Sequence, residues 1–110
     1  MTTEREQLEL AAKACGYVIE RWMNDSSATA ICGMDKNGIK VWEPLHDDGD
    51  CARMEAALGI DVEWEIFTRE VWSSCGNVEI MERFKDYDGD KNAARRAASV
   101  AVAAEIGRMV

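Results

Sequence analysis

The sequence predicts an α+β fold in which a mainly antiparallel sheet of four to five strands is packed with three helices. Hydrophobic periodicity indicates the order α-β-β-β-α-β-β-α, with a weaker strand signal near residues 71–72. Turn residues rather than crossover helices separate neighbouring strand patterns, which favours antiparallel pairing. The length of 110 residues and the hydrophobic content of 47% suit a single domain over residues 1–110.

Local signals place the elements along the chain. Thr3 and Glu6 form a capping box, T-x-x-E, that starts the first helix, and Asn37-Gly38 is a strong hairpin-turn signal. The predicted elements are, in chain order, a helix that Gly16 ends, strands over 17–23, 28–34 and 39–43, a helix over 51–58, strands over 60–67, near 71–72 and over 78–84, and a helix over 91–109. Turns are expected at 24–27, 35–38 and 73–77, and a loop with a helix cap at 86–90.

The charge of the chain is negative and local. With 13 basic and 21 acidic residues the net charge is -8. Residues 43–90 hold 14 acidic and only 4 basic residues, whereas the rest of the chain is slightly basic. This balance argues against direct binding to nucleic acid and against an anionic membrane as partner, because both need clustered Lys and Arg.

One predicted strand carries its acidic residues on a single face. Asp61, Glu63 and Glu65 alternate with apolar residues, so they lie about 7 Å apart in turn, close to the phosphate spacing along a nucleic-acid strand. The face is either a solvated surface that aids solubility or a surface that binds a basic groove on another protein. Trp72, flanked by polar residues, is the expected exposed anchor. The predicted partner-binding residues are Asp47, Asp48, Asp50, Asp61, Glu63, Glu65 and Trp72.

Catalytic and metal-binding patterns are weak. His46 and Cys51 are the one nucleophile pair close in sequence, and the acidic residues between them would raise the thiol pKa. The four cysteines are unevenly spaced, without a C-x-x-C motif, and the chain has a single histidine. The acidic residues at 86–90 do not follow the spacing of a calcium loop and suit a helix cap better. We therefore expect no enzyme activity, no metal and no cofactor.

The last predicted helix is rich in alanine. Short side chains allow close approach to a sheet or to another helix, so internal packing is the favoured interpretation and a homodimer face is the alternative. Arg95 and Arg96 lie on this otherwise apolar helix and are expected to meet the acidic middle of the chain. The chain has no apolar stretch of bilayer length and a polar start, which predicts a cytoplasmic protein.

Four short motifs stand out over residues 42–107, namely Trp42-Glu43-Pro44-Leu45, Asp47-Asp48-Gly49-Asp50, Ala93-Ala94-Arg95-Arg96-Ala97 and Ala104-Glu105-Ile106-Gly107. In this order they resemble small proteins of tailed phages and prophages, some of which are grouped as phage ABA-sandwich proteins. The resemblance implies a phage accessory protein in the bacterial cytosol and carries no active site. The expected function is inhibition of a host factor with a basic groove, such as a CRISPR-Cas component, hence an anti-CRISPR or other anti-defence role. The alternative is a homo-oligomeric accessory or structural phage protein.

Overall fold

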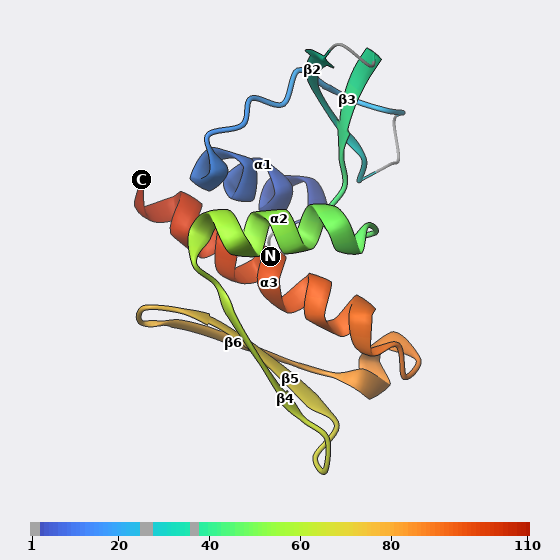
Figure 1. Cartoon of the computed structure of the whole chain (residues 1–110), viewed down its shortest axis with the longest axis vertical. Helices are drawn as coiled ribbons and strands as arrows, with labels where there is room; N and C mark the ends of the chain where they lie inside the picture. Colours follow the sequence, from blue (N-terminus) through green and yellow to red (C-terminus); the bar gives the residue numbers. More distant parts are fainter. Residues whose placement is uncertain (1–2, 25–27, 36–37) are drawn as a thin grey trace.

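The computed structural model describes residues 3–24, 28–35 and 38–110 and confirms an α+β fold (Figure 1). The helices follow in the expected order, but three strands rather than two come between the second and the last helix, because the weak strand signal near residues 71–72 is a full strand. A short 3-10 helix precedes the last helix. The elements are α1 (Glu4–Cys15), β1 (Arg21–Trp22), β2 (Ala30–Asp35), β3 (Gly38–Trp42), α2 (Asp48–Leu58), β4 (Asp61–Glu65), β5 (Glu70–Cys75), β6 (Val78–Arg83), η1 (Phe84–Tyr87) and α3 (Lys91–Met109).

The strands form two sheets, which corrects the prediction of one sheet of four to five strands. The first sheet has the order β1-β2-β3 and the second sheet the order β4-β5-β6, and all neighbours are antiparallel. Figure 1 shows the two sheets at opposite ends of the molecule with the helices between them. Because the helical layers keep the sheet edges apart, the strands of one sheet cannot pair with those of the other.

The alanine-rich helix α3 is the middle layer. It contacts α1 and α2 on one side and β5, β6 and η1 on the other (Figure 1). A helix that is covered on opposite sides must be apolar around most of its circumference. Its buried residues are Ala94, Ala98, Ser99, Val100, Val102, Ala103, Ala104 and Gly107. The predicted internal packing of this helix is therefore confirmed, and these side chains are already used inside the chain.

Local capping chemistry sets the helix ends as predicted. The Thr3 hydroxyl accepts a hydrogen bond from the Glu6 amide at 3.1 Å, and the Asp90 carboxylate accepts one from the Ala93 amide at 3.0 Å. Gly16 ends α1 in the left-handed conformation, with φ of 77°, which glycine adopts without a Cβ clash. The second helix begins at Asp48, earlier than the predicted residue 51, because Asp47 is its N-cap.

Strand boundaries differ more from the prediction. Of residues 17–23 only Arg21–Trp22 form a strand, because β1 finds a partner in β2 over this short length alone. Conversely, β5 runs to Cys75, through residues 73–75 that were expected to turn. Ser73 is buried there because its hydroxyl has a hydrogen-bond partner on α3. The predicted turn residues 25–27 and 36–37 lie outside the described residues.

Candidate protein-binding surface

The second sheet has one covered and one open face. The covered face packs against α3 and includes Val71 and Ser73, which are fully buried. Side chains of directly paired residues point to the same side of a sheet, so the strand register identifies the residues of the open face. They form three rows across β4, β5 and β6, namely Asp61–Ser74–Glu79, Glu63–Trp72–Met81 and Glu65–Glu70–Arg83.

We call this open side the acidic sheet face. Its carboxylates are those of Asp61, Glu63, Glu65, Glu70 and Glu79, and all but the half-buried Glu70 are exposed. Trp72 lies in the middle row, half-buried between the outer rows, and Met81 is its neighbour on β6. A shallow hollow of about 370 Å³ is lined by Glu63, Glu65, Thr68, Glu70, Trp72 and Glu79. The face thus has an apolar centre and a largely acidic rim.

The structure brings four of the predicted partner-binding residues together. Asp61, Glu63 and Glu65 share the open face, as the alternation of β4 predicts, and Trp72 is paired directly with Glu63. Sequence reasoning missed Glu70 and Glu79, since their place depends on the register of β5 with β4 and β6. Placing Glu70 and Glu79 would have required the pairing of β5 with β4 and β6. The predicted strand at 71–72 was too short for that pairing to be assigned.

The other three predicted residues lie elsewhere and have structural partners. Asp47 caps α2 by accepting a hydrogen bond from the Asp50 amide at 2.8 Å. Asp50 accepts hydrogen bonds from the Glu43 amide at 3.0 Å and from the Arg53 guanidinium at 2.6 Å. Asp48 accepts one from Arg96 at 2.6 Å. Because α3 separates α2 from the second sheet, this cluster is not part of the acidic sheet face (Figure 1).

A buried polar network joins α2, α3 and β5. The Glu55 carboxylate, 7% exposed, accepts hydrogen bonds from the Arg95 guanidinium and, at 2.6 Å, from the Ser99 hydroxyl. Ser99 and Ser73 lie 2.9 Å apart between their hydroxyl oxygens. The expectation that Arg95 and Arg96 meet the acidic middle of the chain is confirmed, through Glu55 and Asp48. Every carboxylate oxygen of Glu55 is bonded, so the network serves packing.

The cysteine and histidine that we considered as a nucleophile pair do not form an activated thiolate. Cys51 is buried, and burial together with the negative charge of Glu55 raises the pKa of its thiol to about 12. Its Sγ–H donates to Glu55 at 3.7 Å, whereas His46 is exposed. At neutral pH the thiol is therefore protonated and a poor nucleophile.

The four tryptophans have different environments. Trp42 is buried and meets the Tyr17 ring edge-on at 5.5 Å between ring centroids. Trp22 is half-buried, with the Arg5 guanidinium 4.8 Å above its ring. The most exposed of the four is Trp64, at 41%, which corrects the expectation that Trp72 is the exposed one, since Trp72 is half-buried. Trp64 points to the covered side of the second sheet. Of the four tryptophans, Trp72 is the one on the acidic sheet face. The exposure of Trp64 shows that α3 does not cover this part of the sheet fully.

Two further properties bear on function. Over residues 3–24, 28–35 and 38–110, no group of three or more His, Cys, Asp or Glu side chains is arranged to hold a metal ion. No helix in that part of the chain is both long and apolar enough to cross a membrane.

The chain matches no protein-family model, no curated protein and no solved structure. The resemblance to phage proteins therefore stays a prediction.

Proposed function

We propose that this protein is a non-enzymatic binding protein whose acidic sheet face occupies a basic groove on another protein. The observation that carries the proposal is the gathering of five carboxylates around Trp72 on one open sheet face. An aromatic anchor surrounded by polar residues is the usual arrangement of an interface hot spot. The acidic face could serve solubility or bind a partner. Trp72 favours the second explanation, because a face that served solubility alone would not need a tryptophan at its centre.

The partner class follows from charge. Carboxylates about 7 Å apart along β4 present negative charge at a spacing near that of phosphates. A groove that binds nucleic acid has Lys and Arg side chains placed for phosphates, and such a groove would attract this face over about one Debye length, roughly 8–10 Å. We therefore propose that the protein competes with nucleic acid for the same groove.

On the basis of the phage-like motifs, we propose that the protein inhibits a host nucleic-acid-binding factor in the bacterial cytosol. A CRISPR-Cas effector is one candidate for this factor. The alternative of a homo-oligomeric phage protein uses α3, and the apolar residues of that helix are largely buried within the chain. No specific observation favours this alternative.

The test reverses the charge of the face. Immobilised protein should capture basic nucleic-acid-binding proteins from bacterial lysate at low salt and lose them at high salt. The triple variant Asp61→Lys, Glu63→Lys and Glu65→Lys should lose them at any salt, because the three carboxylates lie side by side. Each captured partner is then purified and bound to labelled nucleic acid. The wild-type chain should displace that nucleic acid, and the triple variant should not.

A matched variant separates the face from net charge. Glu6→Lys, Glu9→Lys and Glu20→Lys make the same change at three exposed residues outside the second sheet. This control should capture and displace as the wild type does. Trp72→Ala, with all charges kept, should weaken displacement by about tenfold or more, as expected for a hot-spot residue. Equal capture by the triple variant and the wild type would contradict the proposal.

A further inference from the structure

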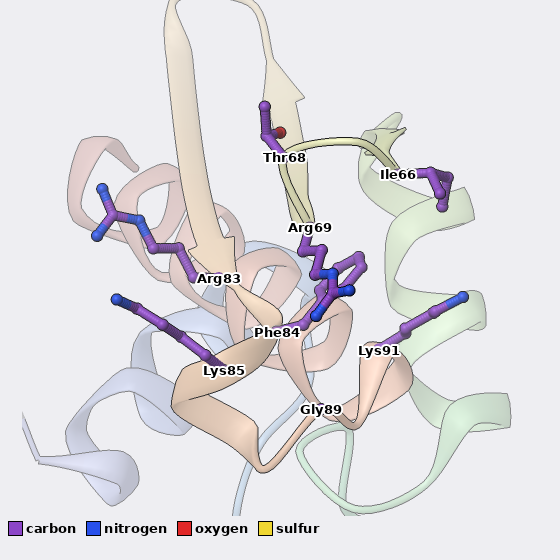
Figure 2. Close-up of a pocket in the computed structure, with 8 residues that line it drawn as sticks. All are labelled: Ile66, Thr68, Arg69, Arg83, Phe84, Lys85, Gly89 and Lys91. Atoms are coloured by element: carbon purple, nitrogen blue, oxygen red, sulfur yellow. The ribbon is translucent and has the colours of Figure 1, made fainter.

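A basic pocket opens at the end of the second sheet that α3 does not cover. It has a volume of about 660 Å³ and lies between the β4–β5 turn, the end of β6 with η1, and the start of α3 (Figure 2). Its lining residues are Ile66, Thr68, Arg69, Arg83, Phe84, Lys85, Gly89 and Lys91. We call this site the basic pocket.

The charge of this pocket is opposite to that of the chain. The net charge of the chain is -8, yet all four charged residues that line the pocket are cations. The acidic segment 43–90 holds only four basic residues, and three of them, Arg69, Arg83 and Lys85, line this pocket. The fold has therefore collected the basic residues of an acidic segment at one place.

Most of these cations have no direct ion-pair partner. In the part of the chain that the structure describes, Arg69, Lys85 and Lys91 form no ion pair, although Asp86 and Asp88 lie in the same loop. Arg83 lies 4.0 Å from Glu70, measured from Nε to Oε2, with its side chain 55% exposed, which is a weak pair. Asp90, the acidic residue beside Lys91, is used to cap α3.

The floor of the pocket is apolar. Phe84 is 5% exposed and packs against Trp64, with 6.1 Å between ring centroids. In Figure 2 the Arg69 and Phe84 side chains overlap at the centre of the view, with Lys91 and Ile66 on one side and Arg83 and Lys85 extending on the other. A flat ring that enters this space would meet apolar carbon below and guanidinium or ammonium groups around it.

The backbone of Arg69 supports a role for this side chain. Its φ is 57°, in the left-handed region, where a residue other than glycine is uncommon and is strained by about 1 kcal/mol or more. Glycine or asparagine would suit the turn better. Such strain, next to a cavity that its side chain lines, is typical of a position where the side chain serves binding.

We propose that the basic pocket binds a small organic anion that combines a flat ring with a phosphate or carboxylate group. Its volume lies in the range of ligand sites, about 300–1,000 Å³. The ring would pack against Ile66, the exposed apolar residue of the lining, and the anionic group would contact Arg69 and Lys91, with Lys85 and Arg83 adding charge. The basic pocket adjoins the acidic sheet face, with which it shares Thr68 and Arg83. The inference does not depend on the proposed function.

The experiment titrates ¹⁵N-labelled protein with adenosine 5′-monophosphate, benzoate and inorganic phosphate, each alone. The monophosphate or benzoate should shift the backbone amide signals of Arg69, Lys85, Gly89 and Lys91 and bind at least about tenfold more tightly than inorganic phosphate. Tighter binding of the monophosphate assigns the anionic group to a phosphate, and tighter binding of benzoate assigns it to a carboxylate. Equal affinity for inorganic phosphate would overturn the role of the ring.

Matched variants localise the site. The double variant Arg69→Gln and Lys91→Gln should weaken binding by about tenfold or more, since two charge-assisted contacts are removed. The control Lys13→Gln and Arg21→Gln makes the same change in net charge at another hollow, which Glu9 and Glu20 also line, and should change affinity by less than about twofold. Arg69→Gly should lose binding while it keeps or gains folding stability, which separates a ligand contact from a structural one. Binding that is equal in all variants, or absent for all three probes at millimolar concentration, overturns the proposal.

Discussion

The Glu55 carboxylate accepts hydrogen bonds from three side chains on two helices, and one of the donors is the Cys51 thiol. The carboxylate accepts from Arg95, Ser99 and the Cys51 thiol. A buried thiol beside a carboxylate resists ionisation for two reasons, burial and like charge, and burial is the larger. Glu55 therefore joins α2 to α3 and adds to the effect of burial, which keeps the cysteine unreactive.

The Cys51 pKa leads to a prediction for alkaline stability. The pKa rises from an ordinary 9.0 to about 12 in the folded chain, so between these values the unfolded chain releases a proton that the folded chain keeps. The free energy of unfolding should therefore fall as pH rises above about 9, by up to about 1.4 kcal/mol per pH unit from this residue. Cys51→Ala should show a shallower fall in urea unfolding between pH 8.5 and 10.5.

Other groups also contribute to the alkaline slope, since burial raises the pKa of the Cys15 and Cys32 thiols as well, and a control separates Cys51 from Tyr87. Burial, with the charge of Glu82, raises the pKa of Tyr87 to about 12, and this contributes a fall of the same sign above about pH 10. Tyr87→Phe should reduce the fall only above about pH 10, whereas Cys51→Ala should reduce it from about pH 9, so the two single variants should differ in the pH range over which the slope becomes shallower. An alkaline slope that Cys51→Ala leaves unchanged would show that the thiol ionises as freely in the folded chain as in the unfolded one.

At the scale of the elements, α1 and α3 approach each other through a single glycine. A Cβ at Gly107 would lie 2.0 Å from the Leu10 carbonyl oxygen, a backbone atom that cannot move without moving α1. Gly107→Ala should therefore destabilise the chain by about 1–3 kcal/mol or more, despite the better helix propensity of alanine. The midpoint of urea unfolding measures this loss.

Gly49 is the matched control for that substitution. It also lies in a helix, α2, but a Cβ there would meet only side-chain atoms of Asp47 and Arg53 at 3.2 to 3.3 Å. These side chains can move by the few tenths of an ångström required, so Gly49→Ala should change stability by less than about 1 kcal/mol. Similar losses from both alanines would contradict the close approach of α1 and α3.

Sequence patterns predicted helices better than strands, and the reason is physical. Helix ends depend on residues within one turn, so Thr3, Asp90 and Gly16 could be interpreted locally. Strands depend on partners that are distant in sequence, which is why residues 17–20 have strand-like composition but form no strand. Ser73 belongs to a strand for the same reason, because its buried hydroxyl is satisfied by Ser99, 26 residues away.

The candidate surfaces also show that features within one strand can be predicted from the sequence, whereas features that join distant segments cannot. The shared face of Asp61, Glu63 and Glu65 follows from alternation within one strand, and the structure confirms it. The place of Trp72 on that face needed the strand register. The basic pocket could not be predicted, because Arg69 in the β4–β5 turn, Arg83 at the end of β6 and Lys91 at the start of α3 meet only in the folded chain.

At the scale of the whole molecule, α3 is the layer on which both halves depend. It contacts α1 and α2 on one side and the second sheet on the other. Without it, Leu8, Met54 and Val71, all fully buried, would lose part of their cover. A chain that stops at Asp90 should therefore be unfolded throughout, because neither half retains a closed core.

The amide spectrum of that truncated chain measures the prediction. Collapse of the ¹H dispersion for the residues of both sheets is the expected result. Dispersed signals from β4, β5 and β6 alone would contradict it, because they would show that the second sheet folds without α3. Adding a separate peptide of residues 91–110 should restore part of the dispersion if packing onto α3 is what the truncated chain lacks.

The position of α3 in the middle layer also has a consequence for synthesis on the ribosome. The helix follows, along the chain, every element that it covers. While residues 91–109 are still inside the exit tunnel, the apolar sides of α1, α2 and the second sheet have emerged without their shared cover. The nascent chain thus passes through a stage with its future core exposed, and its core closes only once α3 has emerged.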